Sequence, residues 1–124
     1  ADIVNRGSVH QTRIQDFLLF NPDRNTRDII TNPPYKFATE FAEHALDISA
    51  DHVKVAMFLK LTFLEGAKRK QLFDKYPPKK IYVFRNRIDC WKNGIKPDNP
   101  SRAVCYAWFV WEKGYSGSPE IAWI

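Results

Sequence analysis

The sequence Asp28-Ile29-Ile30-Thr31-Asn32-Pro33-Pro34-Tyr35 is the stretch that decides the fold. Its first four residues predict a short β-strand, which the prolines end. Asn32 and Pro33 each precede a proline, and this favours extended geometry at both and excludes a continuing helix. Pro33 and Pro34 also lack amide hydrogens. The segment is therefore rich in carbonyl acceptors and poor in donors, which suits a ligand that donates hydrogen bonds.

The residues that follow predict alternating helices and strands. Apolar residues recur with a period of 3.6 from Phe37 to Ile48, which predicts an amphipathic helix. The run from Val53 to Leu59 is almost continuously apolar, as expected for a parallel strand covered on both faces. Further elements are predicted in order, namely a basic helix over 65–76 and strands over 81–84, 103–111 and 120–124.

This order of elements predicts an α/β fold with a mostly parallel sheet. The connection over 89–102 shows no helical period, so we expect the strands on either side of it to form an antiparallel C-terminal pair. In parallel sheets ligands bind beyond the carboxyl ends of the strands. Asn32 to Tyr35 would lie at that position.

Composition fits one domain over 1–124. The chain has 124 residues, of which 44% are hydrophobic and 15% aromatic. The net charge of +5 and the pI near 9.3 favour an anionic partner and allow nucleic acid. No apolar run approaches the roughly 18 residues of a membrane span.

The cysteines and histidines predict neither a disulfide nor a metal site. Cys90 and Cys105 form no CxxC pair, which indicates two reduced thiols and a cytoplasmic protein. His10, His44 and His52 have no ligand spacing with one another or with the cysteines, so we expect no metal.

The motif Asn32-Pro33-Pro34-Tyr35, between a strand and a helix, resembles the Asn/Asp/Ser-Pro-Pro-Tyr/Phe/Trp signature of amino-group DNA methyltransferases that use S-adenosylmethionine. Residues 53–65, 81–88 and 106–111 resemble phage and prophage adenine methyltransferases, so the resemblance covers nearly the whole chain. It implies a Rossmann-like methyltransferase sheet and methyl transfer from S-adenosylmethionine to the exocyclic amine of adenine in DNA.

The resemblance also implies a catalytic set, formed by Asn32, Pro33, Pro34 and Tyr35. During methyl transfer the amine nitrogen gains positive character, and fixed acceptors stabilise its hydrogens. The family assigns this role to the Asn32 side-chain oxygen and the Pro33 carbonyl. Tyr35 would stack on a base rotated out of the duplex.

For the cofactor, the resemblance implies contacts from Asp2, Asp16, Phe17 and Asn32. Asp2 would accept hydrogen bonds from the ribose hydroxyls. Asp16 and Phe17 would meet the adenine of S-adenosylmethionine. The alternatives are an exposed N-terminal charge for Asp2 and a core position for Phe17.

The expected nucleic-acid contacts are Tyr35, Lys36, Arg85, Arg87 and Trp91. Lysine and arginine would contact phosphates, and Trp91 is placed in a polar loop where its ring could stack on a base. The basic run Lys68-Arg69-Lys70 could also follow phosphates, although charge runs are more often solvated faces.

One feature of the family is absent, because no Gly-rich strand-to-helix turn precedes Asp2. We therefore expect a truncated sheet that lacks its first strand and helix, and low affinity for the cofactor. The edge of the strand over 28–31 would then be unpaired and could pair with a second copy of the chain.

Three functions remain open at this stage. The chain is an adenine methyltransferase, a methyltransferase remnant that binds DNA without catalysis, or an unrelated small basic binding module. In the last case Pro33-Pro34 would be a plain strand-to-helix connection.

Overall fold

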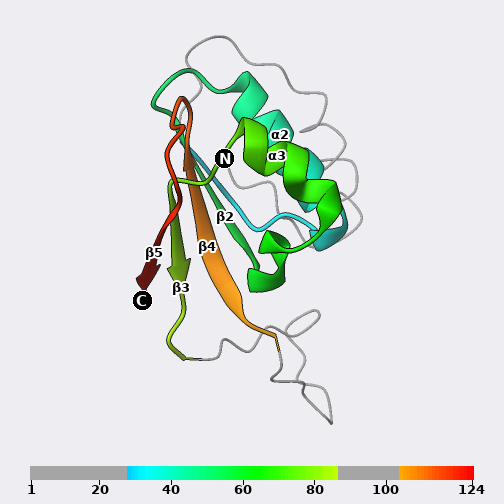
Figure 1. Ribbon diagram of the computed structural model, residues 1–124, viewed down its shortest axis with the longest axis vertical. Helices are drawn as coiled ribbons and strands as arrows, with labels where there is room; N and C mark the ends of the chain where they lie inside the picture. The colour runs from blue at the N-terminus through cyan, green and yellow to red at the C-terminus, as the bar shows by residue number, and fades with distance from the viewer. Residues whose placement is uncertain (1–27, 87–103) are drawn as a thin grey trace.

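The strand β4 (Tyr106–Glu112) lies in the middle of a five-stranded sheet. The computed structural model describes residues 28–86 and 104–124, and in this part the strand order is β1-β2-β4-β3-β5 (Figure 1). The other strands are β1 (Ile29–Thr31), β2 (Lys54–Lys60), β3 (Lys80–Val83) and β5 (Glu120–Trp123). β1 is parallel to β2 and β3 to β5, whereas β4 is antiparallel to both β2 and β3. Four strands therefore share one direction and β4 is reversed.

This arrangement confirms the predicted α/β fold and its mostly parallel sheet. The antiparallel pairing expected between 81–84 and 103–111 is present as the β3–β4 pair. The position of β4 between β2 and β3 was not predicted. The β2–β4 register runs from Lys54 opposite Glu112 to Lys60 opposite Tyr106.

The helices begin directly after the motif. A 3-10 turn, η1 (Tyr35–Phe37), leads into α2 (Ala38–Ile48), close to the predicted helix. The predicted helix over 65–76 is shorter in the structure. It consists of the 3-10 turn η3 (Ala67–Arg69) and α3 (Lys70–Lys75), preceded by η2 (Leu61–Leu64). Figure 1 shows α2 and α3 together on one side of the sheet.

The core lies between these helices and one face of the sheet. In β2, Val55, Met57 and Leu59 are buried, and in β4 their partners Trp111, Phe109 and Ala107 are buried with them. This alternation is the period of two that a pleated strand imposes. The helices add apolar side chains to the same core, among them Phe41, Leu46 and Leu72. The Trp111 indole Nε1 donates a hydrogen bond to the Tyr76 carbonyl at 2.9 Å and so attaches the end of α3 to the sheet.

The other face of β2 is only half-buried, so the expectation of a strand fully covered on both faces is not met. This face of β2 is apolar for another reason, because it contributes Phe58 to an aromatic cluster. The cluster is formed by Phe58, Phe84, Tyr106 and Trp108. Phe58 stacks on Tyr106 with ring centroids 5.0 Å apart, and it meets Trp108 and Phe84 edge to face. Such ring pairs contribute about 0.5–1.5 kcal/mol beyond area burial.

Three further findings concern membrane spans, metal-ligating groups and cysteines in the described ranges. No helix within 28–86 and 104–124 is long and apolar enough to cross a membrane. In the same part of the chain no three metal-ligating side chains gather into a group. Cys105 forms no disulfide within the described residues, and Cys90 lies outside them, so the two reduced thiols stay a prediction.

Candidate functional site

The Asn32-Pro33-Pro34-Tyr35 motif lies at the end of the sheet where β1, β2 and β3 finish and β4 begins. We call this the motif end. The opposite end holds the turn from α2 into β2 at Asp51-His52 and the connection over 112–117 from β4 toward β5. We call that the turn end. Each end has a cavity.

The cavity at the motif end has a volume of about 170 Å³. Its wall comes from the motif, the last residues of β2 and the first residue of β4. The lining residues are Asn32, Pro33, Tyr35, Phe58, Leu59, Lys60 and Tyr106. The structure thus brings three of the four motif residues to one pocket and joins them to the aromatic cluster.

The motif backbone turns from strand to helix at this pocket. Thr31 is buried, Asn32 is exposed and Pro33 is buried. The Asn32 side chain has no hydrogen bond to any residue in the described ranges. The Pro34 carbonyl accepts the Phe37 N–H at 2.9 Å, so Pro34 starts η1 and does not line the pocket. Asn32 is therefore the motif side chain whose hydrogen-bonding groups are unpaired within the described ranges.

Tyr35 is held at the edge of the pocket by two cations. Its side chain is partly exposed, at 39% for the residue. The Lys60 ammonium lies 4.7 Å from the ring centroid and the Arg69 guanidinium 5.6 Å. Arg69 Nη2 also lies 3.4 Å from the Tyr35 hydroxyl, to which it donates. A hydrogen bond with Thr62 lowers the pKa of Tyr35, burial opposes this, and the charges of Arg69 and Lys60 lower it further.

Arg69 is itself fixed by the turn before α3. Its Nη1 donates to the Glu65 carbonyl at 2.6 Å, and the guanidinium lies 4.6 Å from the Phe63 ring centroid. Gly66 has a φ of +109°, a conformation that favours glycine. A Cβ at that position would lie 3.3 Å from Arg69 Nη1. The glycine therefore leaves room for the arginine that contacts Tyr35.

Two further predicted site residues in the described ranges, Lys36 and Arg85, do not line the pocket. Lys36 is exposed and its ammonium lies 5.6 Å from the Phe37 ring centroid. Arg85 follows β3 at the motif end, and its N–H donates to the Ile124 carbonyl at 2.9 Å. Five predicted residues lie outside the described ranges, namely Asp2, Asp16, Phe17, Arg87 and Trp91.

Four residues line the pocket but were not predicted as site residues, namely Phe58, Leu59, Lys60 and Tyr106. One signal could have found Lys60, because it directly follows the apolar run of β2 and so stands at the same edge as the motif. Tyr106 could not be found this way, since its position depends on the insertion of β4 beside β2.

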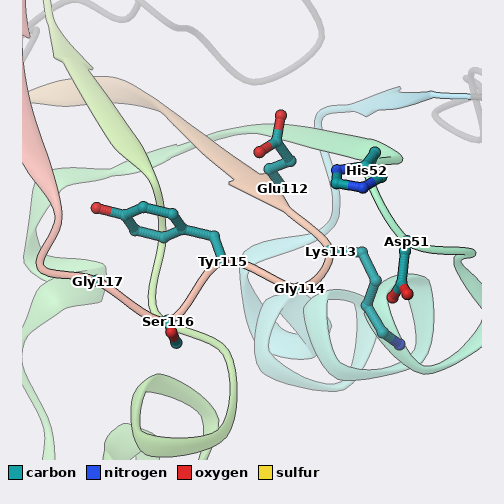
Figure 2. A pocket seen from close by; sticks show the side chains of 8 residues that line it. All are labelled: Asp51, His52, Glu112, Lys113, Gly114, Tyr115, Ser116 and Gly117. Atoms are coloured by element: carbon teal, nitrogen blue, oxygen red, sulfur yellow. The ribbon is translucent and has the colours of Figure 1, made fainter.

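The cavity at the turn end is larger, at about 450 Å³. Figure 2 shows Asp51, His52 and Lys113 on one side of it and Tyr115 on the other. Many of its polar groups hold the turn together. The Lys113 ammonium donates to the Leu46 carbonyl at the end of α2, and the Tyr115 hydroxyl donates to the Ser118 carbonyl at 2.6 Å.

The backbone at this end is also paired. The His52 N–H donates to the Lys113 carbonyl at 3.0 Å, and the Lys113 N–H donates to the Val53 carbonyl at 2.9 Å. These bonds extend the β2–β4 pair by one step and hold His52 at a φ of 71°. We therefore take the motif end, not the larger cavity, as the candidate site.

No protein-family model and no curated protein sequence matches this chain. Among solved structures, it is similar to a predicted O-methyltransferase from Agrobacterium tumefaciens, with a TM-score of 0.53 and 14% sequence identity. That match covers 99% of this chain and 49% of the other, so this chain spans about half the length of its neighbour.

A second solved structure, the complex of M1.HpyAVI with SAM, matches with a TM-score of 0.42 and 15% identity over 90% of this chain and 63% of the other. That score is too low to establish a common fold. The first neighbour, together with the five-stranded mixed sheet, shows that the chain has a methyltransferase-like α/β fold.

Proposed function

We propose that this chain is the catalytic part of an S-adenosylmethionine-dependent methyltransferase that acts on the exocyclic amine of adenine in DNA. The observation that carries the proposal is the pocket at the motif end, where Asn32, Pro33 and Tyr35 face residues of β2 and β4. A methyltransferase-like fold allows many substrates, so the substrate is argued from this site.

The site's own groups suit an amine substrate. The Asn32 side chain is exposed and without a hydrogen bond within the described ranges, so its oxygen is available to accept an N–H from the substrate. An acceptor that meets this N–H stabilises the positive character that the nitrogen gains in the transition state. The Pro33 carbonyl would be the second acceptor. Pro33 is buried, which holds that carbonyl in place.

The aromatic lining suits a base as the carrier of the amine. Tyr35 is exposed at the edge of the pocket, and Phe58 and Tyr106 form a stacked pair in its wall. Stacking of a base on a protein ring contributes about 1–3 kcal/mol, which offsets the cost of a few kcal/mol for moving the base out of the duplex.

The cofactor, when bound, supplies an electrophilic methyl group on a sulfonium. The described residues fit the part of the site that would bind the amine receiving the methyl group. Their pocket offers a hydrogen-bond acceptor and aromatic rings and holds no carboxylate. Asp2, Asp16 and Phe17, together with Asn32, remain our proposal for the cofactor side, and the first three lie outside the described ranges.

A second candidate function is DNA binding without catalysis. The observation that favours it is the contact of Tyr35 with Lys60 and Arg69, which builds a basic and aromatic surface independent of any cofactor. Lys36, Arg85, Arg87 and Trp91 would extend that surface under either function. The unrelated basic module is the outcome if neither cofactor nor DNA binds.

Two measurements test the proposal. Calorimetric titration with S-adenosylmethionine is expected to show binding, and incubation with radiolabelled cofactor and adenine-containing DNA is expected to label the DNA. Absence of heat at millimolar cofactor together with unlabelled DNA would contradict an active enzyme. If the DNA still bound, the second candidate function would hold.

Two minor parts of the proposal concern assembly and location. Within the described ranges β1 is an edge strand paired only with β2, so a second copy could add to it. Sedimentation at several concentrations tests for that homodimer. We also propose a cytoplasmic location, which imaging of the tagged chain would test.

A further inference from the structure

Lys60 is the last residue of β2, and it lines the motif-end pocket. Its contact in the structure is with the Tyr35 ring, 4.7 Å from the centroid. Within residues 28–86 and 104–124 it has neither a carboxylate nor another hydrogen-bond acceptor as a partner. An ammonium has three donors, so Lys60 can bind an anion without breaking any ion pair in this part of the protein.

Three other lysines of the described ranges, Lys70, Lys75 and Lys79, differ from Lys60 because each is paired with a carboxylate. Lys70 pairs with Asp74 at 2.5 Å, Lys75 with Asp47 at 3.2 Å and Lys79 with Glu112 at 3.1 Å. None of these lysines lines the motif-end pocket. Among the described residues that line the pocket, Lys60 is the one cation, and Arg69 contacts the pocket residue Tyr35.

Arg69 is less free to move than Lys60. Its guanidinium donates to the Glu65 carbonyl and to the Tyr35 hydroxyl, and it lies over the Phe63 ring. Lys60 has a flexible stem and a point charge. Arg69 therefore suits a positioning role for the Tyr35 ring, and Lys60 suits direct contact with a charged ligand.

We propose that Lys60 binds a backbone phosphate of the nucleic acid whose base stacks on Tyr35. This inference rests on the proposed function and assigns a residue that contacts the DNA backbone. A base that stacks on the ring face occupied by Lys60 replaces the ammonium there. Base stacking on a protein ring is a stronger contact than the cation–π contact of an exposed ammonium, so the exchange is favourable.

The displaced ammonium then lies beside the bound nucleotide, whose own or neighbouring phosphate is the nearest anion. Nucleic acids offer such an anion at every nucleotide. One lysine would thus cover the ring when the site is empty and neutralise a phosphate when the site is filled.

The test is the salt dependence of binding to a short single-stranded DNA oligonucleotide that contains adenine, measured by fluorescence anisotropy. Each phosphate contact changes the slope of log K against log salt by about 0.7 for single strands. We expect Lys60→Gln to reduce the slope by about that amount and Lys60→Arg to restore it. Lys79→Gln is the matched control, since Lys79 is paired with Glu112. Circular dichroism checks that each variant is folded.

The possible results separate this inference from the proposed function. If the wild-type chain binds and Lys60→Gln keeps the full slope, the phosphate contact is wrong and the nucleic-acid function stands. If Lys60→Gln keeps the slope but loses S-adenosylmethionine binding, Lys60 serves the cofactor and the inference is wrong. If the wild-type chain binds no oligonucleotide at any salt concentration, both the inference and the nucleic-acid function are wrong.

Discussion

At the turn end, Lys113 donates to the Leu46 carbonyl and Lys79 pairs with Glu112 at 3.1 Å. At the motif end, the Asn32 side chain has no hydrogen bond, and Lys60 has no acceptor, within the ranges that the structure describes. The turn-end cavity is nevertheless the larger, at about 450 Å³ against about 170 Å³. We therefore chose the candidate site by the Asn32 and Lys60 side chains, which are unpaired within the described ranges, and not by cavity size.

The comparison of the two ends also distinguishes side chains that stabilise the fold from side chains that are available to a ligand. Side chains that are bonded within the protein contribute to folding, and their loss leaves buried partners unsatisfied. Side chains that are free contribute little to folding and are available to a ligand. Variants at the two ends should therefore differ in what they lose, and four predictions test this difference.

The largest expected effect is that of Asn32→Ala on methyl transfer. Removal of one group that stabilises developing charge typically costs about 10²–10³-fold in rate. Because the Asn32 side chain is exposed and without a hydrogen bond in the described ranges, the melting temperature should not change. The rate is measured with labelled cofactor and the melting temperature by circular dichroism. A large fall in melting temperature would instead make Asn32 a structural cap.

A second prediction compares one tyrosine at each end. Tyr35→Ala should weaken oligonucleotide binding by about 1–3 kcal/mol, the contribution of one base–ring stack. Tyr115→Ala removes the hydrogen bond to the Ser118 carbonyl and the contact of the Lys79 ammonium with the Tyr115 ring, both at the turn end, so it should leave this affinity unchanged. Anisotropy titrations of both variants give the difference. Equal losses of oligonucleotide affinity in the two variants would contradict a role of the motif end in nucleic-acid binding.

A third prediction compares two glycines with positive φ. Gly66 has a φ of +109° and Gly114 one of +96°, so alanine at either position should cost roughly 1–3 kcal/mol of stability. A Cβ at Gly66 would lie 3.3 Å from Arg69 Nη1, whereas at Gly114 the nearest atom, Asp51 Oδ1, is 3.8 Å away. Only Gly66→Ala should therefore disturb Arg69 and reduce oligonucleotide affinity. Urea unfolding and anisotropy measure the two quantities.

The smallest expected effect is a pH dependence of stability from Asp47, near the end of α2. Burial opposes ionisation of its carboxyl, but hydrogen bonds from Tyr76 and Lys75 outweigh burial and lower the pKa below the usual value. A carboxyl whose pKa is lowered by folding stabilises the protein above its unfolded-state pKa, and this contribution is lost as the pH falls through the folded-state pKa.

Asp47→Asn should remove that part of the pH dependence below about pH 4. The effect should be under about 1 kcal/mol, since the carboxylate is half exposed to solvent. Urea unfolding of both proteins between pH 2 and 7 (about the titration range of a carboxyl) measures it. A variant with the same acid sensitivity as the wild type would show that Asp47 does not contribute to it.

Local patterns in the sequence predicted much of the fold. The helix that contains Phe41 and Ala45 follows from apolar spacing, because those spacings mark the buried side of α2. The strand around Val55 and Met57 follows from an apolar run. The place of β4 does not follow, since pairing with β2 as well as β3 depends on contacts between residues far apart in the chain.

The same limit applies to the site. The motif residues Asn32, Pro33 and Tyr35 were found because their order is unusual and their geometry is constrained locally. Arg69 appeared only as one member of a basic run, yet it contacts Tyr35 across 34 residues of sequence. No local pattern encodes such a contact.

The central position of β4 has a consequence for the order of folding. β2 and β3 are complete long before residues 106–112 are synthesised, but they are joined only through β4. Contacts between distant segments form slowly because a long loop must close first. We therefore expect the nascent chain to remain without its full sheet until β4 has left the ribosome, with the apolar side chains of β2 and β3 exposed to chaperones until then.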